Sequence, residues 1–194
     1  MINIDKITKK PLAVQVAGLN PSDDNIEFIG IPATQQVFWM RNGNSLPFEC
    51  LPLTIFQNCQ EQYLNDEIAL KELSALPISQ DRQVEMYIYH LYGDVDATPD
   101  IIDGVLQPSE NFRDTPNCSS IQWKSKWITI DGVVMTPRDL TIIDCIKNDL
   151  PNKAIAAKLG ITPSTLDFHI RNLFKKVNVP TRTALIVKAL NQHV

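Results

Sequence analysis

Long apolar runs are absent from this sequence of 194 residues, and none approaches the roughly 20 residues of a transmembrane helix. The amino-terminal stretch M-I-N-I-D-K-I-T-K-K also lacks the apolar centre of a signal peptide. The apolar fraction of 44% and the charged fraction of 21% are typical of a soluble globular protein. We therefore expect the protein to be cytoplasmic.

Cysteine is scarce, and its spacing does not favour metal binding. Cys50, Cys59, Cys118 and Cys145 include no C-x-x-C pair, so we expect reduced thiols without disulfides. A zinc site built from Cys50, Cys59, Cys118 and a histidine is the alternative, but these spacings match no established ligand pattern. Cys145 lies on the apolar side of a predicted helix and is expected in the core. We predict neither a metal nor a cofactor.

Histidine is also scarce, which argues against an enzyme. His90 is the only histidine before residue 133, so no Ser-His-Asp triad or metal cluster can be assembled there. Trp39, Trp123 and Trp127 could line a ligand pocket, although core or interface positions are more typical of tryptophan. No internal repeat or low-complexity tract is present. We predict that the protein is not an enzyme.

Charge is distributed unevenly along the chain. Residues 1–132 contain nine Lys and Arg against eighteen Asp and Glu, a net charge of −9. Residues 133–194 contain nine against four, a net charge of +5. This asymmetry indicates that only the carboxy-terminal part contacts nucleic acid.

The amino-terminal part shows strand and turn signals. Segments 26–31 and 35–40 are rich in Ile, Val, Phe and Trp and predict short strands. Asn42-Gly43 predicts a hairpin turn, because both residues tolerate positive φ. A returning strand over residues 46–50 contains a proline, which favours an edge position. Residues 11–19 fit a strand or a short helix equally well.

Helical patterns follow. Residues 53–75 and 80–92 are amphipathic with helical periodicity, and a proline and a glycine respectively follow them. The next stretch is rich in Asp, Pro, Ser and Asn and predicts a loop, with one helical turn at residues 99–105. Residues 121–135 are expected to be extended, and Asp131-Gly132 predicts a two-residue hairpin. Residues 1–132 are therefore expected to form a compact α+β domain.

Four helices are predicted after that hairpin. The first begins at the cap residue Thr136, and the second spans residues 152–159 and ends at Gly160. The third spans residues 162–177, with a threonine cap and a proline at its first position, where a missing N–H costs nothing. The last spans residues 181–190. A short helix, a glycine turn and a longer helix with a basic, polar face make a helix-turn-helix.

The segment 162–177 has two contrasting faces. Its apolar side chains recur with helical spacing and are expected to be buried: Leu166, Ile170, Leu173 and Val177. The opposite face suits a polyanion and consists of Ser164, Thr165, Asp167, Phe168, Arg171, Asn172 and Lys175.

The carboxy-terminal sequence resembles the LuxR/NarL/GerE family of bacterial DNA-binding domains over about residues 133–191. The resemblance rests on M-T-P-R-D-L, on P-N-K-A-I-A-A-K-L-G-I-T-P-S-T-L-D-F-H-I-R-N-L-F-K-K-V, and on the N-V-P-T-R-T-A-L that follows. It implies an all-α four-helix domain at residues 133–194 that binds double-stranded DNA. Relatives with a phosphorylation receiver domain begin with a strand that ends in paired acids, whereas Asp23-Asp24 here follow a turn cluster. The amino-terminal part also lacks the aromatic and acid pattern of an acyl-homoserine-lactone pocket.

The resemblance implies roles for matching residues. Asn152 and Lys153 would begin the supporting helix beside the phosphates, and Ser164 and Thr165 would also contact phosphates. Asp167, Phe168 and Arg171 would face the bases, and Lys175 and Lys176 would contact the DNA backbone. Leu185 and Ile186 would form the dimer contact. His169 matches the family histidine and is expected to fix the helix by a hydrogen bond.

Two residues depart from the family pattern. Asp167 stands where many members have Lys, and Ala184 stands where Glu is common. Asp167 either accepts a hydrogen bond from cytosine or leans against Arg171 four residues on, and we favour the ion pair. We predict a sequence-specific transcriptional regulator, a homodimer, whose residues 1–132 mediate dimerisation or regulation. The alternative is an adaptor that uses its helix-turn-helix to contact RNA polymerase or another protein.

Overall fold

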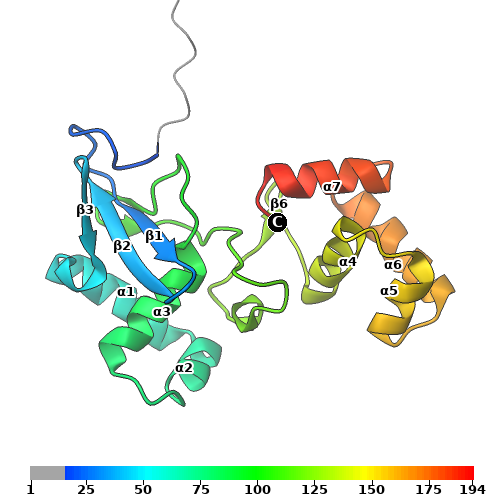
Figure 1. Cartoon of the computed structure of the whole chain (residues 1–194), viewed down its shortest axis with the longest axis horizontal. Coiled ribbons are helices and arrows are strands. Elements are labelled where there is room, and N and C mark those ends of the chain that lie inside the picture. Colours follow the sequence, from blue (N-terminus) through cyan, green and yellow to red (C-terminus); the bar gives the residue numbers. More distant parts are fainter. Residues whose placement is uncertain (1–15) are drawn as a thin grey trace, which may run out of the picture.

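The computed structural model describes residues 16–194 and shows two lobes side by side (Figure 1). An irregular connecting segment, residues 93–136, joins them. The first lobe combines an antiparallel sheet with helices, and the second is helical. This is the predicted order of an α+β region followed by an all-α region. Within the described range, no helix combines the length and the apolar character needed to cross a membrane. The prediction for residues 11–19 falls mostly on residues outside that range.

The sheet of the first lobe is a three-stranded meander. Strands β1 (Glu27–Ile31), β2 (Gln36–Arg41) and β3 (Asn44–Pro47) pair antiparallel in that order. Asn42 and Gly43 form the predicted turn, with φ of 52° and 74°. The proline of β3 lies on an edge strand, as predicted. The returning strand is shorter than expected, because a 3₁₀ helix, η1 (Phe48–Cys50), replaces its second half.

The helix predicted over residues 53–75 is broken in two. Helix α1 (Leu53–Asn65) ends at Asp66, and α2 (Glu67–Leu73) begins there. The Asp66 carboxylate accepts a hydrogen bond from the Ala69 amide at 3.1 Å and another from the Ser125 amide at 2.8 Å. The prediction of one helix was wrong because this buried carboxylate caps α2 and binds a distant loop.

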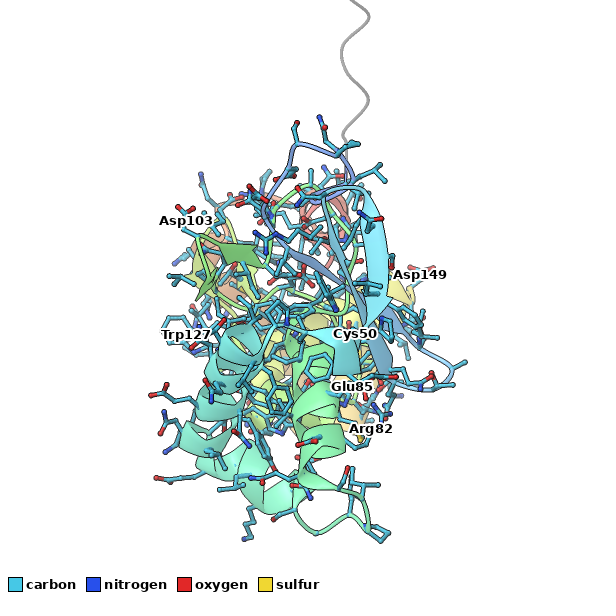
Figure 2. All side chains as sticks on the ribbon, turned by 90° about the vertical axis from the view of Figure 1, so that its left-hand side faces the viewer. Cys50, Arg82, Glu85, Asp103, Trp127 and Asp149 are labelled. Carbon is cyan, nitrogen blue, oxygen red and sulfur yellow. The ribbon has the colours of Figure 1, made fainter. Side chains whose placement is uncertain are left out.

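Helix α3 (Gln80–Tyr92) is present as predicted and packs against β1 and β2. It is more deeply buried than a one-sided helix, because residues 87–92 are all buried. Its Tyr87 ring stacks on Trp123 at 5.5 Å between centroids. Trp39 and Trp123 are therefore core residues, whereas Trp127 is 59% exposed (Figure 2).

The connecting segment holds a hairpin where a helical turn was predicted. Strands β4 (Ile101–Ile102) and β5 (Val105–Leu106) pair across Asp103-Gly104. These two turn residues have φ of 51° and 80°. The helical prediction over residues 99–105 was wrong because the Asp-Gly pair takes left-handed conformations that a right-handed helix excludes.

The second hairpin of the connecting segment matches its prediction. Strands β6 (Thr129–Ile130) and β7 (Val133–Val134) pair across Asp131-Gly132, with φ of 51° and 73°. The extended stretch expected from residue 121 begins instead with a 3₁₀ helix, η2 (Ser119–Gln122).

The second lobe is built from four helices around a core of its own. They are α4 (Pro137–Lys147), α5 (Asn152–Leu159), α6 (Pro163–Lys176) and α7 (Arg182–Asn191). Helix α5 packs against α6, and α4 packs against both α6 and α7. Ile128 and Ile130 of the connecting segment and Cys145 of α4 also belong to this core. The connecting segment is thus packed onto the helical lobe rather than hanging free of it.

Candidate nucleic-acid interface

A tight turn sets α6 against α5. Gly160 ends α5 in the left-handed region, with φ of 65° and ψ of 30°, where glycine is not penalised by a Cβ. The Ile161 amide donates to the Ala156 carbonyl oxygen at 3.0 Å and closes the turn. Ala156 is buried, so its small side chain lets the two helices approach. The predicted helix-turn-helix is confirmed by this arrangement.

Helix α6 starts with a cluster of hydroxyl groups. The Thr162 hydroxyl oxygen accepts a hydrogen bond from the Thr165 amide at 3.2 Å, and Pro163 occupies the first helical position. Ser164 and Thr165 are exposed. Exposed amides and hydroxyls at a helix start are suited to an anion such as a phosphate.

The two faces of α6 lie as the periodicity predicts. Leu166, Ile170, Leu173 and Val177 are all buried in the core of the lobe. The residues of the opposite face are all exposed: Ser164, Thr165, Asp167, Phe168, Arg171, Asn172 and Lys175. Phe168 leaves 55% of its surface accessible, which is unusual for a phenylalanine with no packing role.

Asp167 does not form the favoured ion pair. Its carboxylate accepts a hydrogen bond from the Asn152 side-chain amide of α5 at 3.0 Å. Among the described residues, Asp167 and Arg171 have no ion-pair contact, so that prediction was wrong. An exposed pair one turn apart is worth only about 0.2–0.5 kcal/mol, too little to hold the carboxylate against a nearby amide donor. Lys153, beside Asn152, is exposed.

His169 connects α6 to the start of α4. Its Nε2 atom lies 3.4 Å from the Arg138 guanidinium, and the imidazole ring is half-buried. This contact agrees with the expected fixing role of His169. It also places the exposed Arg138 beside α6, a cation that periodicity had not assigned to this face. Its place in the M-T-P-R-D-L stretch, at the start of a helix, is a signal in the sequence that could have identified it.

The two lysines at the end of α6 differ in their surroundings. Lys175 is exposed, whereas the Lys176 ammonium group pairs with the Asp139 carboxylate of α4 at 2.6 Å. Asp139 also forms a reciprocal capping box with Thr136. Burial opposes ionisation of Asp139, but hydrogen bonds from Lys176 and Thr136 outweigh it and lower its pKa. Lys176 therefore stabilises the packing of α6 on α4, whereas Lys175 makes no ion pair with another described residue.

The predicted dimer contacts on α7 need correction. Leu185 has no accessible surface and belongs to the core of its own lobe, so it cannot contact a second chain without unfolding. Ile186 is half-buried and packs against the same core. Val187 and Leu190 are the apolar α7 residues that are accessible, with exposed fractions of 52% and 55%.

Metal-ligating residues cluster elsewhere than the sequence suggested. The set of Cys50, Cys59 and Cys118 is not brought together in the described residues: Cys50 is exposed and the other two are buried. Cys118 instead lies near His90, with Sγ and Nδ1 3.5 Å apart, and near Asp114. A second cluster, made of Glu27, Asp96 and Glu110, consists of carboxylates only and lies at the junction of the lobes.

Comparison with known proteins gives matches to the helical lobe. The family profile described as bacterial regulatory proteins, luxR family, matches residues 133–189. The nitrate/nitrite response regulator NarP of Escherichia coli (strain K12) is 41% identical over 59 residues, which are 30% of this chain and 27% of NarP. NarL of the same strain is 40% identical over 53 residues, which are 27% of this chain and 24% of NarL. The regulator AlkS of Pseudomonas putida is 32% identical over 63 residues, 32% of this chain and 7% of AlkS.

The matched lengths are short relative to both chains. The chain spans only about a quarter of the length of NarP and NarL. No solved structure matches the chain. The matched region coincides with β7 and helices α4 to α7, whose helix-turn-helix geometry is described above. Residues 133–189 of this chain are a helix-turn-helix domain of the LuxR family of bacterial regulatory proteins.

Proposed function

We propose that this protein is a sequence-specific, DNA-binding transcriptional regulator that inserts α6 into the major groove. The observation that carries the proposal is the exposed face of α6 on a LuxR-family domain. Its base-facing candidates are Asp167, Phe168 and Arg171. A helix is the element that fits the major groove, where base edges present a distinct pattern for each pair.

Phosphate contacts would position α6 on the duplex. The hydroxyls of Ser164 and Thr165 at the start of α6 supply neutral donors, while Lys153 and Lys175 supply exposed positive charge. Asn152 contributes indirectly in this arrangement, because its amide group holds Asp167. Lys176 would reach the backbone only by leaving Asp139, so we assign it a supporting role.

The amino-terminal part is proposed to be regulatory. Residues 1–132 carry a net charge of −9, which repels DNA, whereas residues 133–194 carry +5. We therefore assign DNA binding to residues 133–194 and dimerisation or signal response to residues 1–132, in a cytoplasmic homodimer. If α7 also pairs, the accessible Val187 and Leu190 would form the contact.

A second function is favoured by one observation. Asp167 places an exposed carboxylate on the face that would enter the groove. An adaptor that contacts RNA polymerase or another protein with α6 would not suffer the repulsion between this carboxylate and phosphate. The two functions differ in their dependence on nucleic acid.

Electrophoretic mobility shift with random-sequence DNA, at several salt concentrations, separates them. A regulator is expected to enrich a defined sequence, and its affinity should fall steeply as salt rises, because phosphate contacts release counterions. No shift with any sequence at low salt would reject the regulator in favour of the adaptor.

Arg171→Ala is expected to weaken binding to the enriched sequence by about 1–3 kcal/mol if the guanidinium contacts a base edge. Specificity at one base pair should relax at the same time, which competition with single-position variants of the site measures. Arg41→Ala removes the same charge from the first lobe and should leave binding unchanged. An equal loss on all sequences would assign Arg171 to phosphate.

Asp167→Asn tests the unusual acid on α6. The substitution removes the charge and keeps a side chain that can bond with Asn152. We expect tighter binding to every sequence by a similar factor, because a carboxylate near phosphate is repelled. Binding constants on the enriched site and on shuffled DNA measure the effect. A loss confined to sites with cytosine at one position would show instead that Asp167 reads that base.

A further inference from the structure

Carboxylates from distant parts of the chain meet at the junction of the lobes. Glu27 comes from β1, and Asp96 and Glu110 come from the connecting segment. One oxygen from each of the three lies within 4.8 Å of the others. Asp100 is buried beside them, and burial together with Glu110 and Glu27 raises its pKa. We call Glu27, Asp96 and Glu110 the carboxylate cluster.

The hydrogen bonds of this cluster are incomplete. Glu27 Oε1 accepts from the Asp96 amide at 2.8 Å, and Glu110 Oε2 accepts from the Asp94 amide at 3.0 Å. The second oxygens, Glu27 Oε2 and Glu110 Oε1, are buried and have no hydrogen-bond partner among the described residues. Glu27 as a whole has no accessible surface. A buried acceptor without a partner costs about 1–3 kcal/mol, and more when it is charged.

Nearby side chains balance the charge of the cluster only in part. The Lys126 ammonium group donates to the His90 carbonyl oxygen and lies 5.8 Å from the centre of the Phe112 ring; burial lowers its pKa to about 7. His193 contacts Asp94, outside the cluster. Burial and the neighbouring carboxylates raise the pKa of both Glu27 and Glu110 to about 8, and the charge of Lys126 opposes this rise only in part, at Glu110.

We propose that the carboxylate cluster binds a hard divalent cation through Glu27, Asp96 and Glu110. All of its donors are oxygens, the ligands preferred by Mg²⁺, Ca²⁺ and Mn²⁺. The buried, unpartnered Glu27 Oε2 supplies a ligand without breaking a hydrogen bond of the fold. A cavity of about 500 Å³, lined in part by Asp96 and Glu110, gives an ion and its remaining water ligands access.

The same cavity joins the cluster to the helix-turn-helix lobe. Its lining also includes Asn191, Gln192 and His193 at the end of α7. The Asn111 side-chain amide, next to Glu110, donates to the Gln192 carbonyl oxygen at 2.7 Å. The chain end lies between the lobes (Figure 1). The cation would therefore order the segment that holds α7 and would regulate the affinity of the protein for DNA. This regulatory role rests on the proposed function, whereas the cation site itself does not.

Titration calorimetry of the full chain, freed of metal with a chelator, tests the site with MnCl₂ alone. One Mn²⁺ should bind per chain, and Glu27→Gln and Glu110→Gln should each weaken binding by about tenfold or more, since even outer-shell changes cost 10–100-fold. Asp103→Asn, on the exposed tip of the β4–β5 hairpin (Figure 2), should bind as the wild type does. Cys118→Ser should also bind normally, because it alters the other candidate cluster.

The outcomes separate the site from the regulatory role. Absence of Mn²⁺ binding at millimolar concentration would overturn the site and would mean that the carboxylates are protonated instead. Mn²⁺ binding that survives both glutamine substitutions would also overturn the site. Thermal melts in chelator show whether these variants fold; they should melt close to the wild type, because glutamine keeps an oxygen that can accept from the Asp96 or Asp94 amide. Mn²⁺ that binds without changing DNA affinity would overturn the regulatory role. Absence of DNA binding with and without Mn²⁺ would reject the proposed function alone.

Discussion

Arg113→Met is expected to lower the free energy of unfolding by about 3–5 kcal/mol, the usual cost of removing one partner from a buried ion pair. The Arg113 guanidinium in the connecting segment binds both carboxylate oxygens of Asp144 in α4, at 2.9 Å each. Only 7% and 11% of these side chains are exposed, so Asp144 would be left as a buried charge without its partner. Urea unfolding of the full chain, followed by far-UV circular dichroism, measures the loss.

Two variants control this experiment. Adding Asp144→Leu to Arg113→Met should recover much of the lost stability, because the uncompensated charge disappears. Lys124→Met breaks the exposed pair with Glu67, whose side chains are 52% and 80% accessible, and should leave the midpoint near that of the wild type. Equal midpoints for Arg113→Met and Lys124→Met would contradict the importance of the buried pair.

Leu166→Ala should destabilise the helix-turn-helix lobe by about 2–5 kcal/mol, through lost apolar burial and the cavity left behind. Leu166 has no accessible surface and lies in the core beneath the start of α6. The same unfolding experiment measures the effect, and DNA binding should be lost together with the fold at raised temperature.

Phe168→Ala is the matched control two residues further along α6. Its side chain is 55% exposed, so the unfolding midpoint should hardly move while the affinity for DNA falls. Similar destabilisation by both substitutions would mean that Phe168 packs against the protein. Unchanged DNA affinity of a folded Phe168→Ala variant would remove this residue from the proposed interface.

Local signals in the sequence were sufficient for most of the helical lobe. Threonine side chains cap α4, α6 and α7 at Thr136, Thr162 and Thr181, and Gly160 ends α5. These signals act within one helical turn, which is why predicted and observed boundaries agree closely. The apolar stripe of α6 was predicted in full for the same reason, since helical periodicity alone decides which residues share a face.

Failures occurred where a distant contact decided the outcome. Asp66 breaks a long amphipathic pattern because it can cap α2 and also bind the Ser125 amide, 59 residues away. Asp167 bonds to Asn152 across the turn rather than to its neighbour on α6. Leu185 proved to be a core residue because α7 packs on α4 and buries this side chain in the core of its own lobe, an orientation that amphipathicity could not distinguish from a dimer surface.

By itself, the sequence determined the order of the two regions, the helix-turn-helix and the polar, basic face of α6, because caps, turns and periodicity operate over a few residues. Only the tertiary structure decided how the regions are joined. Arg113 meets Asp144 and Glu27 meets the segment of Asp96, pairs that are 31 and 69 residues apart. Burial then makes these contacts consequential, since charges far apart in an extended chain interact weakly in water but strongly once water is excluded.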